Sequence, residues 1–126
     1  HVLEPLSGYL LLAAKLRKEP SAYGGPWNFG PSSKEARTVM EVVEHLVARL
    51  GRGSINIEAS VEKNHEAKLL QLNCDKAHQK LRWYPRWDFE HTLDMTSDWY
   101  KQMYDGAEVK QITRQQIYRY FPEIGR

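Results

Sequence analysis

Three patterns predict a small α/β lobe in which helices surround two or three short strands. Residues 39–50 place their apolar side chains on one face of a helix, while residues 54–59 and 70–72 alternate apolar and polar side chains as half-buried strands do. The chain has 126 residues, of which 41% are hydrophobic and 27% charged. This length and composition suit one folded domain with its own core.

The first predicted helix spans residues 3–16 and is apolar on nearly every side, so it should be buried on most faces. Its apolar residues are Leu6, Tyr9, Leu10, Leu11, Leu12, Ala13, Ala14 and Leu16. We expect Glu4 to stabilise the start of this helix through the helix dipole. Pro20 predicts its end, and a turn over residues 21–26 and a short strand over 27–29 should follow.

A second helix is predicted between Thr38 and Gly51. Thr38 and Glu41 have the spacing of a capping box, and Gly51 can adopt the left-handed conformation that ends a helix. Gly51 and Gly53 are therefore interpreted as a helix cap and a turn. The sequence has no G-x-x-x-x-G-K or G-x-G-x-x-G loop to hold a phosphate.

Asn73 predicts the start of a short helix that ends before Tyr84, because Pro85 disfavours a helical conformation at the preceding residue. Asp88 predicts the cap of a long helix that ends at Gly106. Its expected inner face consists of Phe89, Leu93, Thr96, Trp99, Tyr100 and Met103. Thr113 and Gln116 predict a capping box for a last helix, which Pro122 limits.

Composition excludes several classes of function. A net charge of +2, with basic and acidic residues interspersed, gives no nucleic-acid-binding stripe. A single cysteine excludes an internal disulfide and fits the cytoplasm, and no apolar run is long enough to cross a bilayer. The chain begins at His1 rather than at a methionine, so we expect a piece of a longer protein.

Few side chains have the spacing of a metal or catalytic site. Cys74 and His65 lack the paired ligands of a zinc centre, so no metal is expected. Cys74 could be activated at a helix start, although a small buried residue is the simpler interpretation. His45 and His91 are expected on solvated faces. The tryptophans could stack on a base, but packing is the favoured role for them; they are Trp27, Trp83 and Trp87.

Four motifs taken together resemble the C-terminal lobe of extended short-chain dehydrogenases of the NAD-dependent epimerase/dehydratase family. They are His1-Val2-Leu3-Glu4-Pro5-Leu6-Ser7-Gly8-Tyr9-Leu10, Trp27-Asn28-Phe29-Gly30-Pro31, Asn73-Cys74-Asp75-Lys76-Ala77 and Leu81-x-Trp83-x-Pro85. The first run favours the branch of the family that acts on CDP-glucose. The resemblance implies that residues 1–126 form a substrate-binding lobe, and that the Rossmann domain for NAD is absent from this chain.

The resemblance also implies a substrate site. The family carries Arg-Pro-x-acid ahead of a strand, and this chain has Lys63-Asn64-His65-Glu66. Glu66 matches the acid that binds the ribose hydroxyls, since a carboxylate accepts two hydrogen bonds at once. Lys63 occupies the position of the phosphate-binding Arg but lacks its planar fork. His65 is a third candidate contact, and an exposed loop is the alternative for all three residues.

The implied activity is that of a nucleotide-sugar dehydratase. The chain contains neither a dinucleotide fingerprint nor the catalytic Tyr-x-x-x-Lys pair, so it is expected only to hold the nucleotide end of the substrate. The expected partners are a nucleotide sugar and the Rossmann lobe of the same protein, with a parent that is a homodimer or larger. Two alternatives stay open: a lobe of an epimerase or reductase, and a non-catalytic interaction domain.

Overall fold

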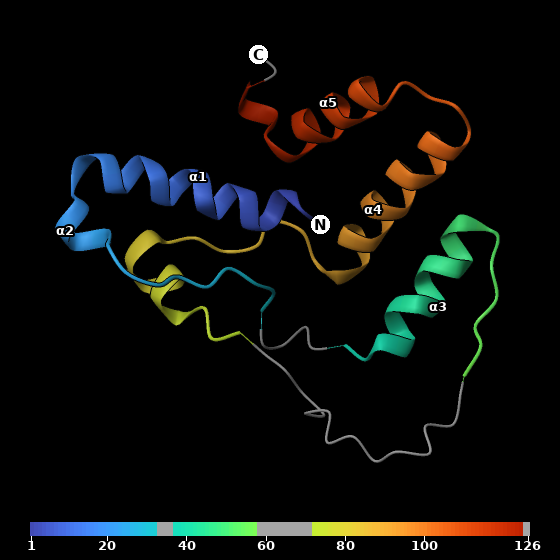
Figure 1. Ribbon diagram of the computed structural model, residues 1–126, viewed down its shortest axis with the longest axis horizontal. Helices are drawn as coiled ribbons and strands as arrows, with labels where there is room; N and C mark the ends of the chain where they lie inside the picture. Colours follow the sequence, from blue (N-terminus) through green and yellow to red (C-terminus); the bar gives the residue numbers. More distant parts are fainter. Residues whose placement is uncertain (33–36, 58–71, 125–126) are drawn as a thin grey trace.

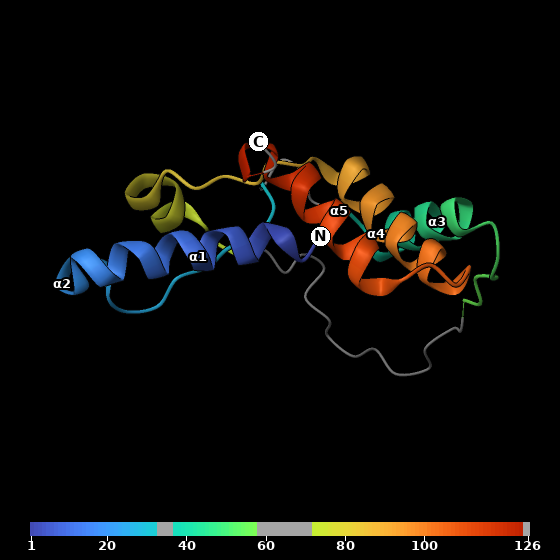
Figure 2. The ribbon, with the colours of Figure 1, turned by 90° about the horizontal axis from the view of Figure 1, so that it is seen from above.

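The computed structural model describes residues 1–32, 37–57 and 72–124. Its helices are α1 (Leu3–Lys18), α2 (Pro20–Tyr23), α3 (Val39–Leu50), η2 (Ala77–Leu81), α4 (Phe89–Tyr104), α5 (Val109–Tyr120) and η3 (Pro122–Ile124). Helices α1, α2 and η2 occupy one end of an elongated molecule, and α3, α4 and α5 occupy the other (Figure 1). The view from above shows the same division, with the start of α1 next to α4 and α5 (Figure 2).

The predicted α/β class is wrong for the part of the chain that the structure describes, which contains helices and no strand or sheet. Residues 27–29 and 54–57 have no strand partner, and Ile57 is 73% exposed. Alternation marks a surface suited to half-burial, but a strand also needs a neighbouring backbone to pair with. Residues 58–59 and 70–71, which belong to the other predicted strand segments, lie outside the described ranges.

Helix α1 confirms the first predicted helix and extends to Lys18. The expected burial on most faces is wrong for the described residues, since Leu6, Tyr9 and Leu10 are 43%, 55% and 65% exposed.

A short helix, α2, occupies the first part of the turn region expected after Pro20, and Gly25 in the core of that region has a positive φ of 89°. Proline at the first position of a helix loses no hydrogen bond, because the N–H of that position has no partner within the helix. Pro20 therefore begins α2, directly after α1 has ended. The chain therefore reverses through a short helix rather than a β-turn.

Helix α3 has the predicted ends. The Thr38 hydroxyl accepts a hydrogen bond from the Glu41 N–H at 3.2 Å, and the Thr38 N–H donates to the Glu41 carboxylate at 2.7 Å. Gly51 ends the helix in the left-handed region with φ of 68°. The capping box and the glycine are thus both confirmed.

Helix α4 begins as predicted, since the Asp88 carboxylate accepts from the His91 N–H at 2.8 Å. Its inner face was only partly predicted: Leu93 is buried, but so are Met95 and Ser97, while Tyr100 is 46% exposed. The difference arises because α4 contacts both α3 and α5, so two of its sides are covered.

The predicted start of α5 is wrong. The helix begins at Val109 after Glu108, four residues before the expected cap at Thr113. The Thr113 hydroxyl instead accepts a hydrogen bond from Trp99 Nε1 at 2.9 Å, which joins α5 to α4. The Thr113 hydroxyl, which the capping-box pattern predicts at the start of a helix, therefore forms a contact between two helices instead.

A compact apolar cluster lies between α1 and η2. Phe29, Ala77, Leu81 and Trp83 are buried, and the partly buried side chains of Leu11, Leu12, Tyr23 and Trp27 pack against them. The ring of Phe29 lies directly over Gly8, and a Cβ added at Gly8 would collide with it. Only glycine fits at this position of α1, and Trp83 is a packing residue as predicted.

The segment leading to Trp83 has an unusual end. Asn73 Oδ1 accepts from the Asp75 N–H at 2.9 Å, as predicted for a cap, and the helix continues as the π-helix η2. It ends at Leu81, where the next residue, Arg82, adopts the left-handed conformation with φ of 54°. The helix thus ends before Tyr84, as predicted, but Pro85 is not the cause. The left-handed conformation is costly for a non-glycine residue, and burial of the next residue, Trp83, offsets the cost.

Candidate functional site

The predicted substrate-binding residues Lys63, His65 and Glu66 lie outside the residues that the structure describes. Residues 72–76, the next described segment along the chain, form hydrogen bonds with residues 24–30. Asn28 Nδ2 donates to the Asn73 carbonyl at 3.1 Å, and Lys76 Nζ donates to the Pro26 carbonyl at 2.9 Å. Residues 72–76 are therefore fastened to residues 24–30.

The aromatic rings near this segment are occupied by neighbours from the chain itself. The Lys76 ammonium lies 4.2 Å from the centre of the Trp27 ring, and Tyr23 stacks with Trp27 at 6.2 Å. The Trp87 ring meets His1 at 5.2 Å and Tyr120 at 4.9 Å, edge to face. These contacts favour the packing role predicted for the tryptophans over stacking on a base.

Cys74 is buried, with Sγ 3.6 Å from the Leu72 carbonyl. Burial raises the pKa of the Cys74 thiol. A hydrogen bond from the backbone at Gly30 lowers this pKa, but the effect of burial is larger. A raised pKa leaves little thiolate, the reactive form, at neutral pH. The simpler interpretation of Cys74 as a small buried residue is confirmed.

Glu4 is the centre of a buried polar network, a role that the sequence alone did not predict. Its carboxylate is 8% exposed and accepts from the backbone N–H groups of Arg86 at 3.0 Å and Trp87 at 2.9 Å, and from the Tyr120 hydroxyl at 2.6 Å. A buried carboxylate is tolerated when such donors surround it. Glu4 thus joins the first turn of α1, the segment before α4 and the end of α5.

The donors around Glu4 are themselves fixed. Burial, followed by the hydrogen bond to Glu4, raises the pKa of Tyr120 to about 12, so the hydroxyl keeps its proton at neutral pH. Arg86 Nη1 donates to the Tyr120 carbonyl at 2.8 Å, and Nη2 donates to Glu123 at 3.0 Å, which lowers the pKa of that carboxyl. Each ionisable group of this network forms a hydrogen bond or ion pair with another part of the chain. We therefore interpret the network as structural, and we call it the Glu4 joint because it connects α1, the segment before α4 and α5.

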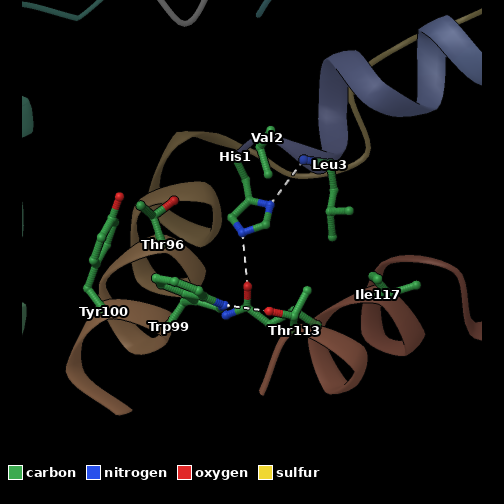
Figure 3. A pocket seen from close by; sticks show the side chains of 9 residues that line it. His1, Val2, Leu3, Thr96, Trp99, Tyr100, Thr113 and Ile117 are labelled. Carbon is green, nitrogen blue, oxygen red and sulfur yellow. Dashed lines mark hydrogen bonds between the residues drawn. The ribbon is translucent and has the colours of Figure 1, made fainter. Parts of the chain in front are cut away.

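A pocket of about 250 Å³ opens beside this joint, between the start of α1 and helices α4 and α5. Figure 3 shows its lining side chains converging from the three helices. The lining residues are His1, Val2, Leu3, Thr96, Trp99, Tyr100, Thr113, Gln116 and Ile117. Its walls are therefore largely aromatic and aliphatic.

Several polar groups of the pocket have hydrogen-bond partners within the chain. Leu3 N–H donates to His1 Nδ1 at 3.2 Å, so the proton of a neutral His1 ring belongs on Nε2, which donates to Gln116 Oε1 at 3.0 Å. Gln116 Nε2 in turn donates to the Met95 carbonyl at 2.6 Å. The dashed lines in Figure 3 show the contacts of His1 and the Trp99–Thr113 bond. These hydrogen bonds connect the start of α1 with α5, and α5 with α4.

His45 was expected on a solvated face, and the structure corrects this. His45 Nε2 lies 2.8 Å from Asp94 Oδ1, and Arg49 Nε lies 2.7 Å from the same oxygen, so two side chains of α3 hold one carboxylate of α4. His91 packs against the ring of Trp87 at 4.9 Å. Across residues 1–32, 37–57 and 72–124, no three acidic, histidine or cysteine side chains gather as a metal site would require.

The chain is similar in sequence to a region of a known enzyme. No family model matches the chain. Over all 126 residues it is 36% identical to CDP-glucose 4,6-dehydratase of Salmonella typhimurium, and the match spans 35% of that enzyme. The chain is thus related to a region of a dehydratase and corresponds to about a third of its length. None of the helices that the structure describes is long and apolar enough to cross a membrane.

Proposed function

We propose that this chain is the nucleotide-sugar-binding portion of an NAD-dependent CDP-glucose 4,6-dehydratase, which converts CDP-glucose to CDP-4-keto-6-deoxyglucose. In this proposal residues 1–126 form the C-terminal lobe of a longer protein whose N-terminal domain binds NAD. The observation that supports it most is the 36% identity that runs through the whole chain to a dehydratase of that name.

The residues of this chain do not fit NAD. A dinucleotide site needs a glycine-rich turn between a strand and a helix, at the carboxyl edge of a parallel sheet. The sequence has no such fingerprint and no Tyr-x-x-x-Lys pair, and the described residues form no sheet. Cofactor binding is therefore assigned to the rest of the parent protein.

The role left to this chain is to bind and orient the nucleotide. In our proposal the Glu66 carboxylate accepts hydrogen bonds from both ribose hydroxyls, and the Lys63 ammonium attracts the diphosphate as a point charge. His65 lies between them in sequence and supplies a further polar contact. These assignments rest on the match of Lys63-Asn64-His65-Glu66 to the family pattern.

Isothermal titration calorimetry of this chain with CDP-glucose, UDP-glucose and CMP tests the proposal. We expect CDP-glucose and CMP to bind more tightly than UDP-glucose. Replacing Glu66 by Gln removes a charge-assisted acceptor from the ribose and should weaken binding by about tenfold, as expected for one hydrogen bond to a charged group.

Glu90→Gln is the matched control, because Glu90 is exposed on α4 and should leave affinity unchanged. A preference for UDP-glucose would point instead to the lobe of an epimerase. Absence of binding by this chain and by the complete product of its gene would contradict the proposal and favour an interaction domain.

A further inference from the structure

Helices α3 and α5 have twelve residues each and both pack against α4, but they are attached to it differently. Helix α5 buries Ile112, Gln116 and Tyr120. None of the residues of α3 is buried, and its apolar stripe is only half-buried. Figure 1 shows α3 beside α4, at the end of the molecule far from α2. The contact of α3 with α4 is therefore the weaker of the two.

The ends of α3 are stabilised by local bonds that do not involve α4. The Thr38–Glu41 capping box begins the helix, and at its other end the Gly51 N–H donates to the Val47 carbonyl at 3.0 Å. Such caps favour the helical conformation but do not hold a helix against its neighbour. Because a helix of this length is marginal in water by itself, α3 depends on its contacts with α4 to stay folded.

Two polar contacts between α3 and α4 meet at one atom of Asp94. Asp94 Oδ1 lies 2.8 Å from His45 Nε2 and 2.7 Å from Arg49 Nε. The side chains of Asp94, His45 and Arg49 are 35%, 23% and 54% exposed, so water and salt ions reach this contact and weaken its electrostatic attraction. Neutralising one carboxylate therefore weakens both contacts at once.

We propose that α3 is a strap, a helix that separates from α4 while the rest of the chain stays folded, and that Asp94 is the latch that holds it in place. Separation uncovers the half-buried side chains of α3, such as Leu46, and the ring of Phe89, which His45 meets edge to face at 6.3 Å. Segments with few buried apolar contacts open at a lower free energy than global unfolding requires. The strap opens whether or not the chain binds a nucleotide.

Hydrogen exchange of the complete gene product, followed by mass spectrometry of peptides from α3 and α5, tests the strap. After correction for intrinsic rates, we expect the amides of α3 to exchange at least about tenfold faster than those of α5. Urea below the unfolding transition should accelerate exchange in α5 more than in α3, because global unfolding exposes more surface than a local opening. Equal rates and equal urea dependence in the two helices would overturn the proposal.

A matched pair of aspartates tests the latch. Asp94 and Asp98 lie one turn apart on α4 and are both partly exposed, but Asp98 accepts from Gln102 and pairs with Arg119 of α5. Asp94→Asn should accelerate exchange in α3 by about twofold to fivefold, the effect expected for an exposed ion pair, and Asp98→Asn should leave α3 unchanged. Equal effects of the two substitutions on α3, or no effect of Asp94→Asn, would overturn the proposal.

Discussion

The two ends of the molecule bury apolar side chains alike but differ in how many polar side-chain pairs link their helices. At one end, α1 and η2 enclose the apolar cluster of Phe29, Leu81 and Trp83. At the other, α4 and α5 bury Leu93, Met95 and Ile112. Polar side-chain pairs add to this burial, and His45–Asp94 and Trp99–Thr113 are examples. Glu4 connects the two ends through Arg86, Trp87 and Tyr120.

This contrast predicts different sensitivities. Apolar burial depends little on pH or salt, whereas hydrogen bonds and ion pairs respond to both. Damage to the apolar cluster should therefore unfold the chain under all conditions. Damage to a polar link should be smaller and should depend on the solution.

Trp83→Ala should have the largest effect. The Trp83 side chain is 5% exposed, packs edge-on against Phe29 at 5.0 Å and donates through Nε1 to the Ser7 hydroxyl at 2.8 Å. Removing a buried large aromatic side chain costs about 3–5 kcal/mol of unfolding free energy. Urea unfolding followed by circular dichroism measures this loss. A loss below about 1 kcal/mol, within the range of surface substitutions, would contradict the assigned core.

Tyr120→Phe should have an intermediate and pH-dependent effect. The folded-state pKa of Tyr120 is raised to about 12 from the ordinary value of 10.0. The raised pKa means that this group stabilises the fold fully below about pH 10, and that its contribution is lost as the pH rises toward 12. At pH 7 the substitution should cost about 1–2 kcal/mol, because the Glu4 carboxylate loses a donor.

Thermal unfolding of the two proteins between pH 7 and pH 11.5 measures the difference. The gap between Tyr120→Phe and the unmodified chain should narrow above pH 10. A constant gap over this range would show that the Tyr120–Glu4 hydrogen bond does not join the two ends.

Asp94→Asn should have the smallest effect. Asp94 is partly exposed and is shared between His45 and Arg49, and such ion pairs contribute about 0.5–1 kcal/mol that salt reduces. The loss should shrink when sodium chloride is raised to 1 M. A loss that is independent of salt would indicate packing rather than charge as the force between α3 and α4.

Local signals in the sequence predicted the helices better than the joints between them. The Thr38–Glu41 capping box, Gly51 and the caps at Asn73 and Asp88 depend on neighbouring residues only, and all four are present. The start of α5 failed because a contact with Trp99 competes for the Thr113 hydroxyl. The strand predictions for residues 27–29 and 54–57 failed for a similar reason, since a local pattern does not supply a pairing partner.

The Glu4 joint could not be predicted from local patterns. Its donors lie 82 to 116 positions away in the sequence, and a carboxylate in the first turn of a helix has an ordinary explanation in the helix dipole. The pocket depends in the same way on His1 meeting Gln116, at a separation of 115 positions. The candidate substrate residues Lys63, His65 and Glu66 remain predictions from the sequence pattern.

The most direct test of the functional account is to incubate the complete gene product with NAD and CDP-glucose and to weigh the nucleotide sugar by mass spectrometry. The account predicts that CDP-glucose loses the mass of one water, that UDP-glucose is a poor substrate, and that the 126-residue chain alone converts neither. A complete protein that leaves CDP-glucose unchanged, or a short chain that dehydrates it unaided, would contradict the account.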